Sequence, residues 1–223
     1  MRAMVDVNQV VRETLALRAA AIVVVAAACA MAISPVRRTV LRSAGQVLVA
    51  ADEAGPADLL VMDVESGAAG VLSLGDLHHS QPAATVAILV PEGTRVDHEL
   101  QRRGIVLPNL TVELLAQLGV ARDAVVRIPA GEGGTTHTTA ALAEWGRKNP
   151  GRQVLVVVGP SHGRRFRRAL QRVWPDDGRP APRVVTTPYA MFRAEDWWRS
   201  RTTLREGLVE LQKLALDYAR HPW

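Results

Sequence analysis

Cysteine is nearly absent from the sequence, and its scarcity excludes two kinds of chemistry. The single cysteine is Cys29, which lies inside an apolar run near the N-terminus. The rest of the chain therefore contains neither a disulfide nor a thiol nucleophile. Because proteins on either side of a bacterial membrane can do without disulfides, this composition does not fix the compartment.

Aromatic residues are also scarce, at 4% of the chain, and the basic residues are not interleaved with them. No helix-turn-helix or zinc-finger spacing occurs, so we expect no nucleic acid partner. The formal net charge is nevertheless +5, and nearly all the positive charge is arginine. Two explanations stay open: the codon bias of a high-GC genome, and attraction to the phosphates of lipids or nucleotides.

Apolar residues, in contrast, are plentiful, and they make up 48% of the 223 residues. This content indicates a packed globule rather than a disordered chain. Once the N-terminal segment is set aside, the remaining length suits one ordinary domain. Apart from alanine-rich stretches, the sequence has no repeat and no low-complexity segment.

The N-terminal segment contains an uninterrupted apolar run over 19–33, which is short for a membrane helix of about 20 residues. Residues 15–36 reach that length if Arg18 extends toward the lipid headgroups. We favour a signal-anchor helix, and a cleaved signal peptide or a buried core helix stays open. Arginines flank the run on both sides, so the positive-inside rule leaves its orientation open. The chain is thus divided into a tail, a transmembrane anchor, a linker and an α/β domain, at residues 1–14, 15–36, 37–57 and 58–223.

In the α/β domain, short apolar runs bounded by glycine, proline or polar residues alternate with helical patterns. Such runs are typical of strands that are buried on both faces. The alternation predicts a parallel sheet covered by helices on both sides. Strands are expected at 58–64, 84–90, 124–128, 154–158 and 183–187, and helices at 68–79, 95–103, 112–118, 136–147, from Ser161 onward, and over 194–220.

Polar and small residues follow four of these expected strands. Ligands bind at the carboxyl ends of the strands in open parallel sheets, so we expect these loops to form one crevice. The candidates are Asp63, Glu65, Ser66 and Gly67 after the first strand, Glu92 and Gly93 after the second, Gly131–Thr136 after the third, and Ser161, His162 and Arg165 after the fourth.

The fourth of these loops contains the strongest candidates. Ser161 is expected to cap a helix, and His162 and Arg165 lie three residues apart on one face of its first turn. An imidazole can give or take a proton near neutral pH, and a guanidinium suits phosphate or carboxylate. The helix N-terminus adds free N–H groups for an anion. A histidine that only caps the helix and an arginine on a solvated face stay open as alternatives.

The loop at 131–136 and the remaining histidines are less informative. Glycines in this loop allow backbone N–H groups to approach a phosphate, but the lysine of a P-loop is missing, and a merely flexible loop stays open. No cysteine or carboxylate is spaced to complete a metal site with His78, His79 or His137. The sequence therefore predicts no metal.

Several stretches, taken in order over about residues 55–220, resemble the YdcF-like family. The family pattern has an aspartate that leads the first strand, a Ser-Gly-Gly turn after the second and a Thr-x-Glu-Asn-Ala helix start. It continues with a strand that runs into His-x-x-Arg and closes with a tryptophan and a late Glu-x-x-Lys. In this chain the corresponding stretches are Asp58 with DLLVMDV, ILVPEG at 88–93, Thr136–Ala140, VVVGPSHGRR with His162 and Arg165, and WWRSRTTLREGLVELQK with Glu210 and Lys213.

The resemblance implies a Rossmann-like three-layer sandwich, tethered to a bacterial inner membrane by one N-terminal helix, with the domain outside the cytoplasm. It also implies a role in cell-envelope biogenesis or maintenance, a lipid-carrier phosphate as a partner, and, by analogy with one branch, S-adenosylmethionine as a cofactor. The chain departs from the family pattern at the first three motifs. Asp63-Val64-Glu65-Ser66-Gly67 stands where glycines normally follow the first strand. Pro91-Glu92-Gly93 replaces Ser-Gly-Gly, and Thr138 and Thr139 replace a glutamate and an asparagine.

These observations lead to one functional hypothesis and one alternative. The hypothesis is a membrane-anchored domain that binds a small anionic or phosphate-bearing ligand and, if it is an enzyme, hydrolyses or transfers a phosphoryl group. The alternative is a non-catalytic accessory subunit of a membrane protein complex. The expected catalytic residues are His162 and Arg165, and the expected ligand-binding residues are Glu65, Ser66, Gly67, Glu92, Gly93, Gly134, Thr135, Thr136, Ser161 and Glu210.

Overall fold

The computed structural model describes residues 15, 18, 32–50, 52–105, 108–132, 134–178 and 180–222. Its contacts divide the chain into two units, residues 1–43 and 44–223, and only the second contains the sheet. The described part of the first unit is helical from Ser34 onward. The tail at 1–14 and most of the expected anchor at 15–36 lie outside the described residues.

The second unit is built on a five-stranded sheet in which every pair of neighbouring strands is parallel. The strand order is β3-β2-β1-β4-β5, which is the order of a Rossmann-like fold. All five strands lie where the sequence predicts them, which confirms the α/β class. Their bounds are β1 Leu59–Met62, β2 Thr85–Val90, β3 Val126–Pro129, β4 Val154–Val158 and β5 Arg183–Thr186.

The two central strands explain why the sheet is buried on both sides. All residues of β1 and β4 are buried, because these strands consist of branched or long apolar side chains. Alternate residues point to opposite faces, so Leu59 and Val61 join one apolar core while Leu60 and Met62 join the other. Each buried side chain of this size contributes about 1.5–3 kcal/mol through removal from water.

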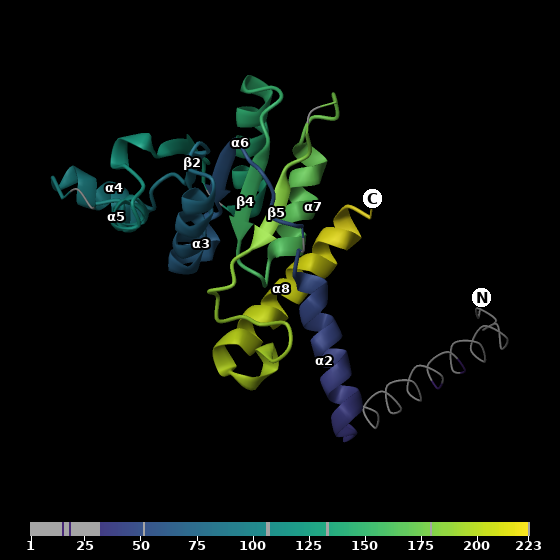
Figure 1. The fold of residues 1–223 in the computed structure, drawn as a ribbon. Coiled ribbons are helices and arrows are strands. Elements are labelled where there is room, and N and C mark those ends of the chain that lie inside the picture. The colour runs from purple at the N-terminus through teal and green to yellow at the C-terminus, as the bar shows by residue number, and fades with distance from the viewer. Residues whose placement is uncertain are drawn as a thin grey trace, which may run out of the picture. The chain divides into compact units, whose positions relative to one another are not determined.

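Helices cover both faces of the sheet (Figure 1). Residues of α3 and α5 contribute to one core and residues of α6 and α7 to the other, so the unit has three layers. The helices of the second unit are α3 Gly67–Ser80, α4 Arg95–Arg102, α5 Leu110–Gln117, α6 Gly134–Lys148, α7 Gly163–Val173 and α8 Arg201–Arg220, with short 3-10 turns η1 Val64–Ser66, η2 Arg122–Ala124 and η3 Trp197–Arg199.

A helix occupies much of the expected linker at 37–57. Helix α2 spans Ser34–Leu48, with a proline at its first turn, where the missing N–H costs nothing. Gly45 and Leu48 near its end are buried, so apolar packing continues the helix into a stretch that the sequence analysis assigns to a link. Among the described residues, no helix combines the length and the apolar content needed to cross a membrane.

Two helix starts differ from the prediction. The N-cap position of α7 is occupied by His162, whose side chain makes no capping hydrogen bond, rather than by Ser161, which is buried. The helix expected over 194–220 begins only at Arg201, where the Ser200 side chain accepts a hydrogen bond from the Thr203 N–H. Trp197, which the helical pattern includes, instead lies in η3 with 1% of its surface exposed. Burial of this large ring overrides the helical periodicity upstream of the cap.

Candidate functional site

The candidate site lies at the carboxyl edge of the sheet, where the strand order reverses. From β1 the chain proceeds outward through β2 and β3, and it then returns to place β4 on the other side of β1. Loops that leave β1 and β4 therefore run to opposite faces and leave room between them for a ligand. Asp63 directly follows β1, and its N–H donates to the carbonyl of Val157 in β4.

The central contact of the site joins Asp63 to His162. The Asp63 Oδ2 atom lies 2.9 Å from Nε2 of His162, and each side chain is only 4% exposed. Gly159, at the end of β4, allows this close fit, because a Cβ there would lie 3.3 Å from Nδ1 of the ring. Aspartate therefore fixes the orientation of the imidazole from the neighbouring strand.

The environment of His162 favours its protonated form. Burial by itself lowers the pKa of this imidazole, but the hydrogen bond and the charge of Asp63 oppose it. The charges of Glu65 and Glu210 add to the effect of Asp63, so the net pKa lies above the ordinary value of 6.5. His162 is thus a buried imidazole whose acidic neighbours favour its protonated form.

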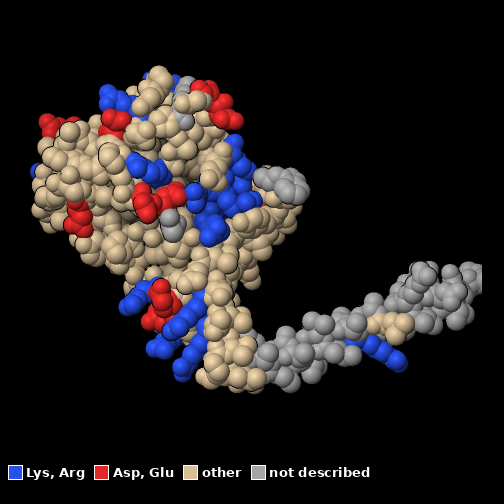
Figure 2. All heavy atoms as spheres, turned by 45° about the vertical axis from the view of Figure 1, so that its right-hand side comes forward, with Lys and Arg blue, Asp and Glu red and all other residues tan. Residues whose placement is uncertain are grey.

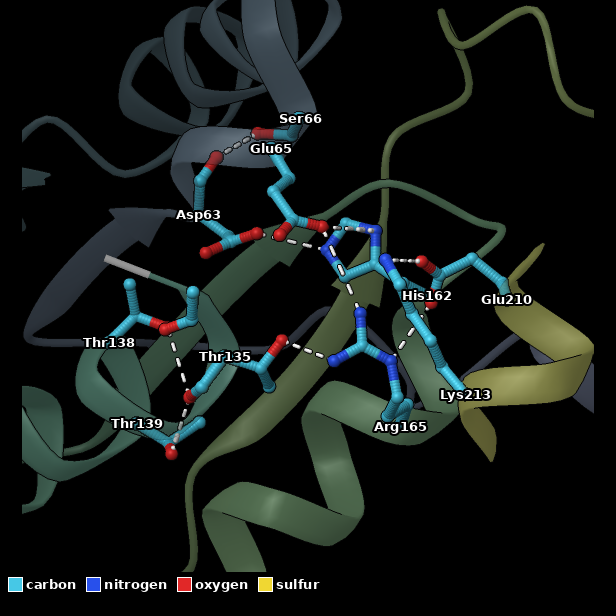
Figure 3. A network of polar contacts seen from close by, with 11 residues as sticks. Asp63, Glu65, Ser66, Thr135, Thr138, Thr139, His162, Arg165, Glu210 and Lys213 are labelled. Carbon is cyan, nitrogen blue, oxygen red and sulfur yellow. Dashed lines mark hydrogen bonds and ion pairs between the residues drawn. The ribbon is translucent and has the colours of Figure 1, made fainter. Parts of the chain in front are cut away.

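Glu65 approaches the same imidazole from the opposite side. It lies in η1, two residues after Asp63, and its Oε2 is 3.9 Å from both Nδ1 of His162 and the Arg165 guanidinium. Its side chain is 44% exposed, whereas the imidazole and guanidinium beneath it are mostly buried. Figure 3 shows the Glu65 carboxylate turned toward both groups. It is therefore the solvent-accessible acid of the cluster.

Arg165 connects the histidine to α8. Its Nε donates to Glu210 at 2.9 Å, and its NH1 donates to the Thr135 hydroxyl at the start of α6. Lys213 also donates to Glu210, at 2.6 Å (Figure 3). Burial by itself raises the pKa of Glu210. The hydrogen bonds and charges of Arg165 and Lys213 lower it by more than burial raises it, so the net pKa lies below its usual range. Three helices thus hold one guanidinium in place at the sheet edge.

A basic depression of about 240 Å³ opens beside Arg165. Residues of α7, α8 and the start of α6 line it, and Figure 2 shows Lys and Arg side chains gathered on the surface that α7 and α8 form. Asp217 pairs there with Arg168 and Arg172. The cationic lining residues are Arg165, Arg172, Lys213 and Arg220. They outnumber the acids there, so the depression favours an anion.

A group of three residues in the site has the composition of a metal-binding cluster. One donor atom from each of Asp63, Glu65 and His162 lies within 4.8 Å of the others. Carboxylate oxygens and an imidazole nitrogen are ligands for divalent transition metals. The sequence predicts no metal site, because residue spacing alone does not bring these three residues together.

Five of the sequence-predicted residues meet in one polar network: Glu65, Thr135, His162, Arg165 and Glu210. Ser66 lies at its margin, where its hydroxyl donates to the Asp63 carbonyl. Thr136 lines the basic depression, and Gly134 opens α6 with a φ of +73° that suits glycine. Gly67 plays a similar backbone role at the start of α3, with a φ of +52°.

Two predicted residues lie apart from the network. The Glu92 N–H bonds to the Gly131 carbonyl, and Gly93 lies against Asp97 and His98 of α4. Both are exposed on the connection that follows β2. Because β2 is separated from β4 by β1, residues after β2 belong to a different part of the sheet edge. Their assignment as ligand-binding residues stays a prediction.

Asp63 is a central residue of the network that the sequence does not predict as a ligand-binding or catalytic residue. In the sequence it is one of several polar residues that follow the first expected strand. The signal that identifies it is topological: only the strand order places β1 beside β4, and hence Asp63 beside His162. Asp58, which leads β1, instead binds the Gln153 N–H at 2.7 Å, at the other end of the sheet.

No protein-family model matches this chain, and a search of curated proteins finds no similar sequence. The class of this protein is defined by its fold and its site. It is a Rossmann-like α/β protein with a buried aspartate–histidine pair and an arginine at the carboxyl edge of its sheet.

Proposed function

We propose that this protein binds a small anionic ligand, such as a phosphate ester, at the carboxyl edge of its sheet, beside His162 and Arg165. The observation that carries the proposal is the arrangement around Arg165. This guanidinium is 14% exposed and lies between the buried Asp63–His162 pair and the basic depression. A mostly buried arginine that opens onto a cationic hollow is suited to a phosphate or a carboxylate.

The chemistry that the residues support is hydrolysis or transfer of a phosphoryl group. Arg165 would stabilise the negative charge that spreads over the phosphoryl oxygens. His162, oriented by Asp63, would give a proton to the leaving oxygen, because its surroundings raise its pKa and so favour the protonated form. Glu65 lies on the solvent side of the imidazole, where its carboxylate could take a proton from the attacking water and pass it to His162.

The cellular setting belongs to the same proposal and rests on the sequence. The apolar run at 19–33 supports a single membrane anchor, and the YdcF-like resemblance supports a domain outside the cytoplasm that acts in envelope maintenance. A lipid-carrier phosphate at the membrane surface would then be the nearest source of a suitable ligand. S-adenosylmethionine, a carboxylate-bearing cation, is the other ligand that the resemblance suggests.

The test is a thermal-shift measurement on the full chain with inorganic phosphate, pyrophosphate, a polyprenyl-phosphate headgroup analogue and S-adenosylmethionine. A ligand at 100 times its dissociation constant stabilises the fold by about 2.7 kcal/mol, which corresponds to a shift of roughly 5–10 °C for a domain of this size. We expect a shift that Arg165→Gln abolishes and Arg205→Gln, on the exposed surface of α8, retains. The absence of a shift with all four compounds would contradict the proposal.

A second candidate is a non-catalytic accessory subunit. One observation favours it: Arg165 already bonds to Glu210 and Thr135, and Asp63 already bonds to His162, as in a purely structural network. Under this alternative, His162→Gln leaves the protein's role in the cell intact, provided that the variant still folds. A stoichiometric membrane partner would then co-purify after mild detergent extraction.

A further inference from the structure

The acidic side of the site carries more negative charge than the nearby cations compensate. Asp63 and Glu65 both face the imidazole of His162. Among the described residues, the only other cation near Glu65 is Arg165, at 3.9 Å. Arg165 already forms a shorter ion pair with Glu210. A proton on His162 is one way to balance this charge. A divalent cation is another, and the donor atoms suit it.

From this geometry we infer that Asp63, Glu65 and His162 together bind one divalent metal ion. Each residue offers one donor atom, and the three atoms lie within 4.8 Å of one another. Metal–ligand bonds of about 2.0–2.2 Å place two ligands of the same ion about 3.0–3.4 Å apart. The 2.9 Å between Asp63 Oδ2 and His162 Nε2 is already close to this spacing. The ion takes the place of the proton that these two atoms share.

Glu65 supplies the third ligand by moving toward the other two. Its Oε2 lies 3.9 Å from Nδ1 of His162, so the carboxylate has to turn toward Nε2 before it can share an ion with Asp63 Oδ2. The side chain is 44% exposed and makes no hydrogen bond within the described part of the chain, only ion-pair contacts of 3.9 Å, so it can change its rotamer. Asp63 and His162 are fixed by burial, so two rigid ligands and one mobile ligand surround the ion.

The ligand set favours Mn²⁺ or Zn²⁺ over Mg²⁺. One imidazole and two carboxylates suit borderline transition metals, whereas Mg²⁺ prefers oxygen ligands and retains its waters. Three protein ligands leave coordination positions open toward Arg165, whose guanidinium adjoins Glu65. An anion could then lie between the metal ion and Arg165.

This inference goes beyond the proposed function and changes one part of it. When His162 binds a metal ion it cannot also donate the proton, and water bound to the ion would supply it instead, because a metal ion lowers the pKa of bound water. Metal binding does not depend on the anion site, however. Arg165→Gln is expected to abolish stabilisation by phosphate compounds while the chain still binds one metal ion, so the failure of either proposal can be distinguished from the failure of the other.

The experiment is a titration of the chelator-treated full chain with Mn²⁺, followed by the paramagnetic resonance signal of the free ion, with Zn²⁺ as a competitor. We expect one Mn²⁺ per chain, displaced by Zn²⁺. Glu65→Gln should weaken the affinity at least about tenfold, while Glu53→Gln, at an exposed glutamate outside the site, should not change it.

Two results would overturn the inference. One is that the folded chain binds neither ion. The other is that Mn²⁺ binding is the same in the wild type, Glu65→Gln and His162→Gln, which would place the ion elsewhere. Because Glu65 is exposed, its variant is expected to fold even if His162→Gln does not, so the test remains decisive.

Discussion

At the scale of single residues, the pair formed by Asp63 and His162 determines the character of the site. A carboxylate held 2.9 Å from a buried imidazole opposes the effect of burial on the imidazole pKa. Asp63 directly follows β1 and His162 lies at the start of α7, just after the neighbouring strand β4, and both side chains are buried. Their contact therefore has measurable consequences for protonation and for stability.

Replacing Asp63 should lower the pKa of His162. In Asp63→Asn the carboxylate charge disappears, and burial, the largest single influence on this imidazole, then acts with less opposition. The pKa of His162, followed by NMR titration of the ring protons, should fall below its wild-type value. Asp58→Asn removes a carboxylate at the opposite end of β1 and should leave it unchanged. An unchanged pKa in Asp63→Asn would show that the pair is not formed in solution.

The stability of the fold should decrease with rising pH above the ordinary histidine range. The folded state binds the His162 proton more tightly than the unfolded state, in which the pKa is 6.5. The stabilisation is therefore complete below pH 6.5 and is lost as the pH rises through the higher folded pKa. Urea unfolding in the presence of a chelator should reveal this loss in the wild type. His162→Gln should remove this part of the pH dependence, and the exposed control His221→Gln should retain it.

At the scale of elements, the ion pairs between α7 and α8 hold the last helix against the site. Arg165 pairs with Glu210, and Arg168 and Arg172 pair with Asp217 two turns further along α8. The guanidinium of Arg168 also lies 3.7 Å from the centre of the Tyr218 ring. Since α8 contributes Glu210 and Lys213 to the site, its docking and the position of Arg165 depend on each other.

Loss of the Glu210 carboxylate should destabilise the fold and loosen Arg165. Glu210 is 7% exposed and accepts hydrogen bonds from two cations, so Glu210→Gln should cost about 1.5–3 kcal/mol. Chemical denaturation measures the change in free energy of unfolding. Glu206→Gln, one turn earlier on the less buried surface of α8, should cost much less. Equal effects of the two substitutions would mean that the pair with Arg165 contributes little.

At the scale of the whole molecule, the two units are expected to have separate tasks. The second unit carries the sheet and the site, while the proposed anchor belongs to the first. If the apolar run is a membrane anchor, the full chain should remain with membranes after alkaline carbonate washing. A chain that begins at residue 44 should not. Recovery of the full chain in the carbonate-soluble fraction would count against the anchor.

Much of the fold could be predicted from the sequence, because buried strands leave a direct signature. Val154–Val158 is apolar throughout and ends at a glycine and a proline, so β4 is evident without a structure. The start of α8 was harder to predict from the sequence. Trp197 continues the helical periodicity, and only its burial in the folded protein places it in η3 rather than in the helix. The part of helix α2 beyond residue 36 could not be predicted, because only tertiary packing buries Gly45 and Leu48 near its end.

The site could be predicted only in part. His162 and Arg165 were identified because they follow an evident strand at short spacing, and Glu210 was identified through the YdcF-like resemblance. The role of Asp63 could not be predicted, because 99 residues separate it from His162 and only the strand order brings them together. The composition of the metal-binding cluster depends on the same long-range contact.

The most direct test of the central claim is to map where a phosphate compound binds in solution. Pyrophosphate can be titrated into the isotope-labelled chain while backbone amide shifts are followed by NMR. The account predicts saturable shifts with a common dissociation constant at the first turn of α7 and at Thr135 and Thr136, and their loss in Arg165→Gln. Shifts confined to other elements, or shifts that persist in Arg165→Gln, would contradict an anion site at this edge of the sheet.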